Sequence, residues 1–453
     1  MRTLIAILTV LTLTVSGNWV HAQENAKRPA AVSDKHQFWQ SEGYGFILEL
    51  TGKQVKVYNY TKDSLVPFGQ GNMEGNGDIY ILEIYGNAKL LADLGVKRLG
   101  MGRFADGSLT DRLGYVKRLK RVDRLPQVKY KGFSEDPVHN FEVFWQSFEE
   151  NFSFFPIVKA DWKAMYKTYR PKVNAATSTK ELESIFSEMF GKLNDGHSVL
   201  ISKNGIRYSK LSNAREQVYQ ANSEWMQRNV EKTYIEGAMT GKLDGRIAYG
   251  RTASGEAYIR LTGFDESDPL RIDKALAEMV EDLADCRNFI IDMRFNMGGE
   301  DFFGLNIAGL FTDQRKLAYI KQARTGAYEQ FSKPIKVYVE PGAKRFKADN
   351  VVVLTSPLTV SAGETGTMAL QSLDQATVIG EATSGYFSDM LLRMLPNKQI
   401  FTLSNERYMT PEGVNYEQRG LPPDEEIVVK QADIDARKDP VMQRALELST
   451  RKP

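Results

Sequence analysis

Short apolar strands alternate with amphipathic helices along the stretch from Tyr258 to Gly380. The expected strands are residues 258–262, 289–293, 351–355 and 377–380, and the expected helices are residues 270–284, 302–311 and 363–373. Consecutive parallel strands need a crossover connection, usually a helix, so this alternation predicts a mainly parallel sheet covered by helices. In such α/β folds the chemistry is usually built at the carboxyl ends of the strands.

In the chain before this stretch, apolar residues recur with a different period. From about residue 37 to residue 127, short strands at residues 46–50, 54–60 and 79–85 are separated by turn residues. This pattern is typical of a small, mostly antiparallel β domain. The last strand of that domain, residues 115–124, is basic, and we interpret it as a charged sheet edge rather than as a nucleic-acid site.

Beyond Pro126 the apolar residues recur with the period of a helix. Aromatic side chains recur at three- and four-residue spacing, namely Phe141, Phe144, Trp145, Phe148, Phe152 and Phe155. This spacing predicts an amphipathic helix whose aromatic face packs in a core. A later helix opens with the capping box Ser178 to Glu181 and ends in the sequence Asp195-Gly196-His197. We therefore expect a helical domain that ends in this Asp-Gly-His motif.

The first residues have the pattern of a signal peptide. A charged start leads into the apolar run Leu4 to Val15 and then into Val20-His21-Ala22, a small-residue cleavage site. The run is shorter than the ~20 residues of a membrane-spanning helix, so no stable membrane insertion is expected. We predict cleavage after Ala22 and a periplasmic or secreted protein. The predicted division is residues 1–22 as signal peptide, 23–130 as β domain, 131–200 as helical domain and 201–453 as α/β core.

Charge and side-chain content exclude several kinds of function. With 59 Lys and Arg against 57 Asp and Glu, the net charge of +2 gives no basis for binding nucleic acid. The single cysteine, Cys286, allows no internal disulfide and is interpreted as a packing residue. Because the few histidines are scattered, we expect no metal and no organic cofactor. The oligomeric state stays open.

The segment from Val351 to Glu364 is the most informative for chemistry. It reads as a buried strand, a turn, and Ser361 at the start of a helix. A serine there lies beside free backbone N–H groups that can receive an oxyanion. Serine is also a favoured helix N-cap, so the segment by itself fits either a nucleophile or a cap.

Two other segments could complete such a site. Gly298 and Gly299 follow the strand at residues 289–293, where glycines let backbone amides approach a ligand closely. His197 follows a helix end and a glycine, a position from which an imidazole can project into a cleft. A lone histidine is as often only hydrogen-bonded in place, so a structural role stays open for His197.

Five motifs occur in the order found in the C-terminal processing (tail-specific) protease family, which includes the tricorn protease core and retinoid-binding repeats. They are Leu-Asn-Asp-Gly-His at 193–197, Ile-Asp-Met-Arg-Phe-Asn-Met-Gly-Gly at 291–299, Thr-Val-Ser-Ala-Gly-Glu at 359–364, Val-Ile-Gly-Glu-Ala-Thr-Ser-Gly at 378–385 and Arg-Gly-Leu-Pro-Pro-Asp at 419–424. The chain resembles this family from about residue 136 to residue 429, and the β domain lies outside the resemblance.

The resemblance implies a serine peptidase with a ClpP/crotonase-like ββα core at residues 201–453, preceded by the small helical domain. Ser361 would attack the peptide carbonyl. The backbone amides of Ala362 and of Gly298 or Gly299 would hold the oxyanion.

The resemblance also bears on the catalytic base. The lysine-using branch carries its base in a loop that here reads Thr-Ser-Gly-Tyr-Phe-Ser at residues 383–388, without a lysine. The tricorn-like branch uses a histidine, matched by His197, and a glutamate, matched by Glu417, so a relay of Ser361, His197 and Glu417 places the chain nearer that branch. The departure is Gly196, where the tricorn-like pattern has a serine.

We therefore expect an exported serine endopeptidase that cleaves peptides or unfolded protein segments. The alternative is a non-catalytic binding protein that keeps the peptidase fold, which Gly196 and the missing lysine favour. A hydrolase that acts on non-peptide esters would use the same site and is a third possibility.

Overall fold

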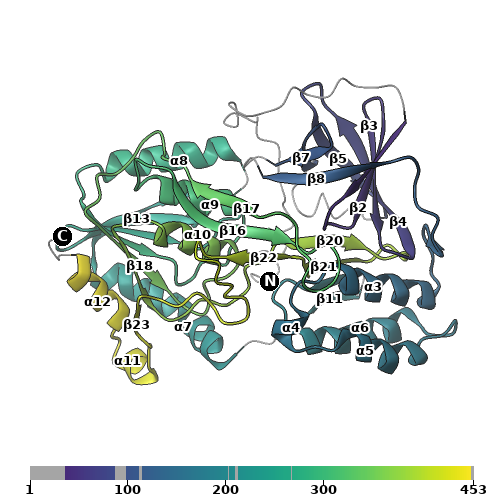
Figure 1. Ribbon diagram of the computed structural model, residues 1–453. Coiled ribbons are helices and arrows are strands. Elements are labelled where there is room, and N and C mark those ends of the chain that lie inside the picture. The colour runs from purple at the N-terminus through teal and green to yellow at the C-terminus, as the bar shows by residue number, and fades with distance from the viewer. Residues whose placement is uncertain are drawn as a thin grey trace.

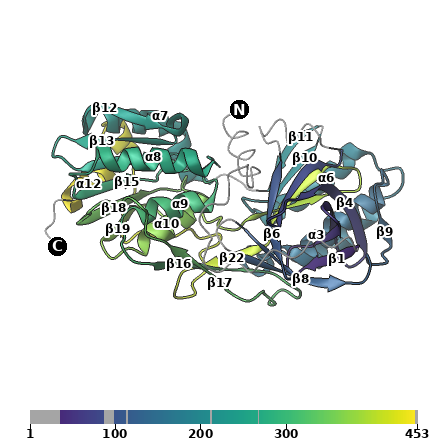
Figure 2. The same ribbon diagram turned by 90° about the horizontal axis from the view of Figure 1, so that it is seen from above.

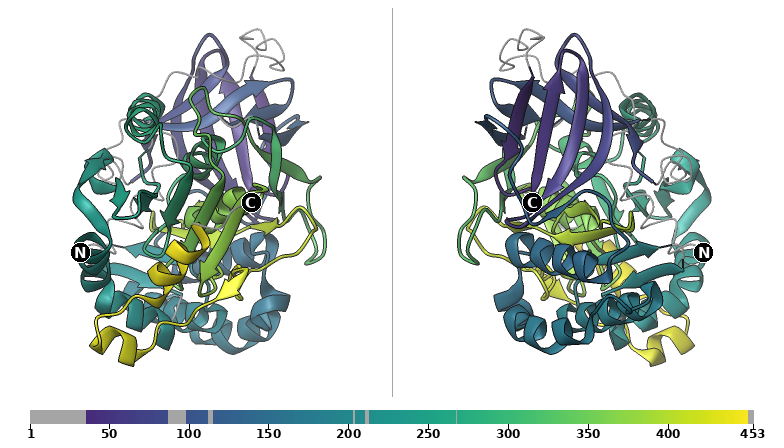
Figure 3. Two further views of the ribbon diagram at one scale, coloured as in Figure 1. Left: turned by 90° about the vertical axis from the view of Figure 1, so that its left-hand side faces the viewer. Right: turned by 90° about the vertical axis from the view of Figure 1, so that its right-hand side faces the viewer.

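The computed structural model describes residues 36–86, 98–111, 115–202, 204–209, 213–266 and 268–449. The predicted signal peptide, residues 1–22, lies outside these residues. Figure 1 shows an α/β unit on one side of the molecule, with a β unit above a group of helices on the other side. Both side views in Figure 3 again show the purple strands of the β unit above the blue helices.

The β unit is a sheet closed on itself into a barrel. Its strands run in the order β3-β2-β1-β8-β7-β6-β5-β4-β9, and β3 also pairs with β4. The strands are β1 (Gln37–Ser41), β2 (Phe46–Thr51), β3 (Gln54–Tyr60), β4 (Ser64–Met73), β5 (Asp78–Ile84), β6 (Leu99–Ala105), β7 (Ser108–Thr110), β8 (Val116–Val122) and β9 (Tyr130–Lys131). Neighbouring strands pair antiparallel except β4 with β9, so the mostly antiparallel character is confirmed.

The basic strand β8 is not a sheet edge. It pairs with β1 on one side and with β7 on the other, so the prediction of a charged edge is wrong. Within β8 only Leu119 is buried. The side-chain pattern of a strand shows which face of the sheet is exposed to water. Whether the strand lies at the edge of the sheet depends on its backbone hydrogen bonds, which run perpendicular to the side chains. The basic pattern of β8 therefore reports its exposure only.

The helices beneath the barrel follow the predicted periodicity. They are α3 (Pro137–Asn151), α4 (Phe155–Val158), α5 (Trp162–Tyr169) with a 3₁₀ turn (Arg170–Lys172), and α6 (Thr179–Leu193). The capping box of α6 is confirmed, because Ser178 N donates to Glu181 Oε2 at 2.8 Å and Glu181 N donates to Ser178 Oγ at 3.3 Å. The aromatic face of α3 packs in the core, where Phe144 stacks on Phe186 of α6 with ring centroids 3.9 Å apart.

This aromatic core is continuous with the interior of the barrel. One cluster of buried side chains contains Leu48 and Phe104 of the barrel, Phe144 of α3 and Phe401 of a later strand. Burial of such side chains from water is the main favourable term in folding. The barrel, the helices and that strand are therefore held together by one hydrophobic core.

The α/β unit contains the predicted parallel sheet. Strands β14, β15, β18, β19 and β23 are parallel, and antiparallel β13 and β12 extend one edge. The strands are β12 (Ile235–Lys242), β13 (Ile247–Thr252), β14 (Ala257–Leu261), β15 (Asn288–Asp292), β18 (Asn350–Thr355), β19 (Ala376–Gly380) and β23 (Glu425–Glu426). The α/β fold class is confirmed, and the predicted strands and helices between residues 258 and 380 lie within a few residues of their expected bounds.

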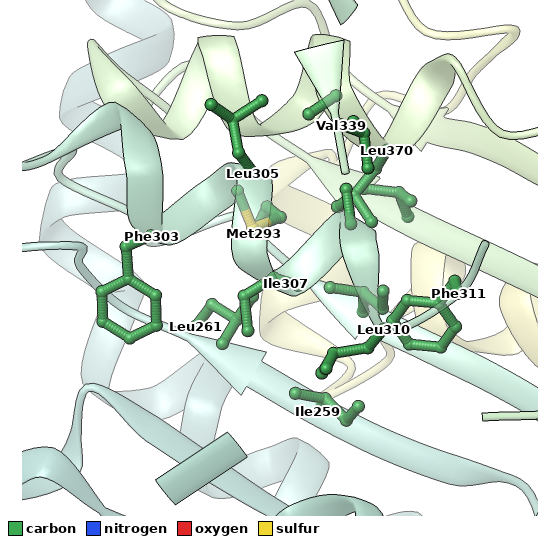
Figure 4. Close-up of a cluster of buried hydrophobic side chains, with 14 of the residues drawn as sticks. Ile259, Leu261, Met293, Phe303, Leu305, Ile307, Leu310, Phe311, Val339 and Leu370 are labelled. Atoms are coloured by element: carbon green, nitrogen blue, oxygen red, sulfur yellow. The ribbon is translucent and has the colours of Figure 1, made fainter. Parts of the chain in front are cut away.

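Helices cover both faces of this sheet. They are α7 (Ala214–Thr233), α8 (Pro269–Asp282), α9 (Asp301–Gly309), α10 (Ala362–Gln371), α11 (Gln431–Asp435) and α12 (Pro440–Ser449), with a 3₁₀ turn at Leu243–Gly245. Helices α8, α9 and α10 share one buried cluster, while α7, α11 and α12 share another with alternate residues of the same strands. Figure 1 shows α8 above this sheet and α7 and α12 below it, and Figure 2 shows the α/β unit beside the β unit. Figure 4 shows Ile259, Ile307 and Leu310 packed together in the first cluster.

Two small sheets join the α/β unit to the rest. One has the order β11-β10-β21-β20 and the other the order β17-β16-β22. Their strands are β10 (Val199–Ser202), β11 (Gly205–Tyr208), β16 (Lys316–Ala323), β17 (Ile335–Val339), β20 (Met390–Met394), β21 (Ile400–Ser404) and β22 (Glu406–Met409). The buried Arg393 of β20 donates through Nη2 to Tyr60 O of the barrel at 2.8 Å. In the described part of the chain no helix is long and apolar enough to cross a membrane.

Candidate active site

Ser361 lies where strand β18 ends and helix α10 begins. Its backbone has φ 58° and ψ −125°, a conformation that non-glycine residues rarely adopt. Such strain persists only where the surroundings enforce it, and it clusters at functional sites. Ser361 as a whole residue is 9% exposed. The sharp turn therefore presents Ser361 at a strand end, where the α/β fold was expected to carry its chemistry.

His197 is brought to Ser361 from a distant part of the chain. The two residues are 164 positions apart, and His197 Nε2 lies 3.2 Å from Ser361 Oγ. Helix α6 ends at Leu193, and the capping residue Asn194 has a left-handed φ of 45° that turns the chain toward the site. A serine hydroxyl within hydrogen-bond reach of an imidazole nitrogen is the geometry of a base-activated nucleophile.

The loop that carries His197 is held by buried polar contacts. Asp195 accepts hydrogen bonds from Ser198 Oγ at 2.5 Å and from Ser404 Oγ at 2.9 Å. The carbonyl oxygen of His197 accepts a hydrogen bond from Thr402 Oγ1 at 2.6 Å. Burial raises the pKa of Asp195, although these hydrogen bonds oppose the shift. Strand β21 therefore holds the side chain of Asp195 and the backbone of His197, the residues on either side of Gly196.

Of the paired glycines, Gly298 lies against Ser361 and Gly299 lies against Phe264. Gly298 has φ 83°, and a Cβ atom on it would lie 2.7 Å from Ser361 Cβ and 3.2 Å from Ala362 N. Gly299 has φ 134°, and a Cβ atom there would lie 2.2 Å from the carbonyl carbon of Phe264. Only glycine fits at either position, because a side chain would overlap its neighbours. The amide of Gly298 donates to Asn296 Oδ1 at 2.9 Å.

Glu364 connects the nucleophile to the loop at residues 383–387, and sequence reasoning did not single it out. Its Oε2 accepts hydrogen bonds from Ser361 N at 3.1 Å and Tyr386 N at 2.8 Å. Its Oε1 accepts from Gly385 N at 2.7 Å and Thr383 Oγ1 at 2.6 Å. Burial raises its pKa to about 7, against the opposing effect of these hydrogen bonds.

Glu417 is buried next to the same loop. Its Oε2 accepts a hydrogen bond from Phe387 N at 3.1 Å, and its Oε1 accepts none from the described residues. Burial, together with the charge of Asp195, raises the pKa of Glu417 well above its ordinary value. The structure therefore buries this predicted residue near Asp195 and does not expose it to solvent.

A buried lysine, Lys321 of β16, lies elsewhere in the fold, although the loop at residues 383–388 has no lysine. Lys321 Nζ lies 3.2 Å from Asp389 Oδ2 and 3.3 Å from Glu406 Oε2. Burial acts to lower its pKa, but the charges of Asp389 and Glu406 outweigh burial and raise the pKa well above the usual range. Lys321 is therefore a cation rather than a proton acceptor.

The described residues contain no group of three or more His, Cys, Asp and Glu side chains arranged to hold a metal ion. Ser361 offers a nucleophile, His197 a base and the glycine loop backbone donors.

Comparison with known proteins agrees with this architecture. Residues 256–427 match the model of peptidase family S41, and residues 133–191 match that of the tricorn protease C1 domain. A carboxyl-terminal-processing protease of Picosynechococcus sp. is 30% identical over 43% of this chain and 45% of its own length. One of Synechocystis sp. is 30% identical over 44% of this chain and 45% of its own length. The chain thus spans less than half the length of these curated relatives.

A solved structure extends the similarity over more of the fold. The crystal structure of a protein of Parabacteroides merdae, named as a peptidase, has a TM-score of 0.60 and 25% identity. The match covers 71% of this chain and 98% of that one. Together with this structure, the two matching models show that the chain contains a peptidase family S41 domain at residues 256–427 and a tricorn protease C1 domain at residues 133–191.

Proposed function

We propose that the protein is an endopeptidase that cleaves peptides or unfolded protein segments, with Ser361 as nucleophile and His197 as base. The observation that carries this proposal is the distance of 3.2 Å between His197 Nε2 and Ser361 Oγ. Both groups are buried, which strengthens electrostatic interactions at the site relative to water. The peptidase family S41 domain supports the same substrate class.

The reaction follows from the positions of these groups. Ser361 Oγ attacks the carbonyl carbon of the scissile bond while His197 Nε2 accepts the hydroxyl proton. The carbonyl π electrons move to oxygen and form an oxyanion. When the tetrahedral intermediate collapses, the C–N bond breaks and His197 returns the proton to the leaving amine. Water then attacks the acyl-enzyme ester by the same route and releases the carboxylate product.

The oxyanion requires backbone donors beside Ser361. Ala362 N lies at the start of helix α10, where N–H groups have no partner within the helix. Gly298 and Gly299 come from the adjacent loop. We assign the second donor to Gly299 in this conformation, because the amide of Gly298 already donates to Asn296.

We assign Glu417 the role of stabilising the imidazolium form of His197. Its Oε1 accepts no hydrogen bond from the described residues, which leaves that oxygen available for a bridging group. A bridge is needed because Gly196 supplies no hydroxyl between the two side chains. In this arrangement Glu417 acts on catalysis by charge and hydrogen bonding and does not touch the substrate.

A non-catalytic binding protein with the same fold is the second candidate. Gly196 favours it, because it removes the hydroxyl that the tricorn-like pattern places beside the histidine. The two candidates differ in one property. A peptidase forms a covalent acyl intermediate on Ser361, whereas a binding protein does not.

A fluorophosphonate probe separates the two candidates. Incubation of the mature protein with the probe should attach one phosphonyl group, and peptide mass mapping should place it on Ser361. The Ser361→Ala variant, folded as judged by circular dichroism, should take up none. Wild-type protein that stays unmodified over hours at excess probe would support the binding protein instead.

We also propose that the protein is exported to the periplasm or secreted, and that its parts are residues 1–22, 23–130, 131–200 and 201–453. The charged start, apolar run and Ala22 site support a cleaved signal peptide. Expression in a secreting host should yield a protein whose intact mass and first residues correspond to a start at Gln23. A folded cytosolic pool that retains Met1 would contradict export.

A further inference from the structure

Gly196 is required for space and not for its backbone conformation. Its φ is outside the left-handed region, so an alanine could adopt the same backbone. A Cβ atom on Gly196 would lie 2.5 Å from Cγ, 2.8 Å from Cδ1 and 3.0 Å from Cβ of Tyr386. Carbon atoms pack at about 3.5 to 4.0 Å, so these separations are severe overlaps. The base of the Tyr386 ring therefore occupies the space beside the residue that precedes His197.

Tyr386 cannot readily move away, because hydrogen bonds fix its backbone on both sides. Tyr386 N donates to Glu364 Oε2 at 2.8 Å, and the next residue, Phe387, donates to Glu417 Oε2 at 3.1 Å. Gly385 N donates to Glu364 Oε1 at 2.7 Å. Both acceptor carboxyl groups are themselves buried. These contacts fix the backbone from which the Tyr386 ring projects.

The carboxylate that fixes this loop also fixes the nucleophile. Glu364 Oε2 accepts hydrogen bonds from both Tyr386 N and Ser361 N. Strand β21 holds the residues on either side of Gly196, because Thr402 Oγ1 donates to the carbonyl oxygen of His197 and Ser404 Oγ donates to the side chain of Asp195. The segment before His197 therefore contacts both β21 and the Tyr386 ring, and Glu364 binds the backbone amides of both Tyr386 and Ser361.

The ring, rather than the hydroxyl, makes the close contact. Tyr386 Oη donates to Asn194 O at a distance of 3.5 Å, which is long for a hydrogen bond. Burial raises the pKa of Tyr386 and keeps its hydroxyl protonated. The phenol is therefore not a proton acceptor for Ser361. Tyr386 therefore acts through the contact of its ring with Gly196.

We propose that Tyr386 is a positioning residue that holds His197 in line with Ser361 through the contact of its ring with Gly196. This inference rests on the proposed function, since it assigns how the base of that reaction is oriented. Displacement of a base by about 1 Å can cost on the order of 10²-fold in rate. Tyr386 and Gly196 act as one matched pair in this arrangement.

The experiment measures the second-order rate of fluorophosphonate attachment to Ser361 in a set of single and double variants. Tyr386→Ala should lower the rate by about 10-fold or more, whereas Tyr386→Phe, which keeps the ring, should stay within about 2-fold of wild type. Gly196→Ala should also lower the rate by about 10-fold or more. Gly191→Ala is the matched control, because a Cβ atom at Gly191 of α6 meets nothing within 4 Å.

Two double variants isolate the proposed contact. In the Tyr386→Ala background, Gly196→Ala should cost less than about 2-fold, because the overlapping ring is gone. In the His197→Ala background, Tyr386→Ala should have no further effect, because a residue that acts only through His197 loses its role with it. A general loss of stability would instead lower the rate in every background, and thermal unfolding of each variant measures that loss directly.

The outcomes separate this inference from the proposed function. If Tyr386→Ala labels at the wild-type rate, or still lowers the rate after His197 is removed, the positioning role is wrong while the peptidase proposal stands. If Tyr386→Ala does not fold, Gly196→Ala and its control Gly191→Ala decide: a lower rate in the first alone supports the contact, and equal rates in the two contradict it. If the wild-type protein is not labelled, the peptidase proposal itself fails.

Discussion

Replacement of His197 by alanine is expected to lower peptide turnover by on the order of 10²-fold or more, because general base catalysis contributes about 10² to 10⁴-fold. Nε2 of His197 lies 3.2 Å from Ser361 Oγ, within reach of the proton that must leave. The measurement is kcat/KM on an unstructured peptide for wild type and variant. The wild-type value should rise with pH through a transition near that of a histidine.

The rival bases give different results in this experiment. Lys321 is held as a cation by Asp389 and Glu406, and burial keeps Tyr386 protonated, so either group would become a base only well above neutrality. If His197→Ala retains most of the activity and the transition moves far above pH 7, another base is used. Folding of the variant is controlled by its melting temperature and circular dichroism.

Glu417→Gln is expected to lower turnover by on the order of 10 to 10²-fold while leaving the fold intact. The carboxyl group, once ionised, stabilises the imidazolium of His197 through charge, and an amide of the same size cannot supply that charge. The effect should fall mainly on kcat, because Glu417 does not touch the substrate. An unchanged kcat would remove Glu417 from the relay.

Glu417→Gln is also expected to become more stable relative to wild type as pH rises. Burial raises the pKa of Glu417 in the folded protein above its unfolded value, so the folded state holds this proton more tightly. The protonated carboxyl group of Glu417 contributes fully to stability below its pKa in the unfolded state. This contribution is lost as pH rises toward its pKa in the folded state. Glutamine does not ionise, so the melting temperature of Glu417→Gln relative to wild type should increase from pH 5 to pH 8.

A melting temperature for Glu417→Gln that falls below wild type as pH rises would contradict this assignment. It would mean that the folded state stabilises the ionised carboxylate. The matched control is Glu426→Gln, because Glu426 on strand β23 is exposed to solvent. Its melting temperature should follow wild type across the same range.

The order of elements in the α/β unit could be predicted because each local pattern agrees with the fold. The apolar runs at β15 and β18 are short and fully buried, and each is followed by a loop and a helix. The meeting of His197 with Ser361 could not be derived from periodicity, since 164 residues separate them. It was expected only because the ordered motifs resemble those of a known family.

Other features leave little or no trace in one sequence. Glu364 stands three residues after Ser361, which is the spacing of a capping box, so its contact with Ser361 N could have been expected. Its bonds to Gly385 and Tyr386 depend on how a distant loop folds back. Likewise, the exclusion of a side chain at Gly196 by Tyr386 depends on three-dimensional contact, because no local pattern relates the two positions.

The core shared by the barrel and the helices makes these two parts one cooperative folding unit. Leu48 and Phe104 of the barrel belong to the same buried cluster as Phe144 and Phe401. Deletion of the barrel would uncover aromatic surface that water disfavours, and such surface promotes aggregation. Loss of activity in a barrel-less chain would therefore report a failure to fold, and an evolutionary path that loses the barrel would first have to rebuild the core beneath it.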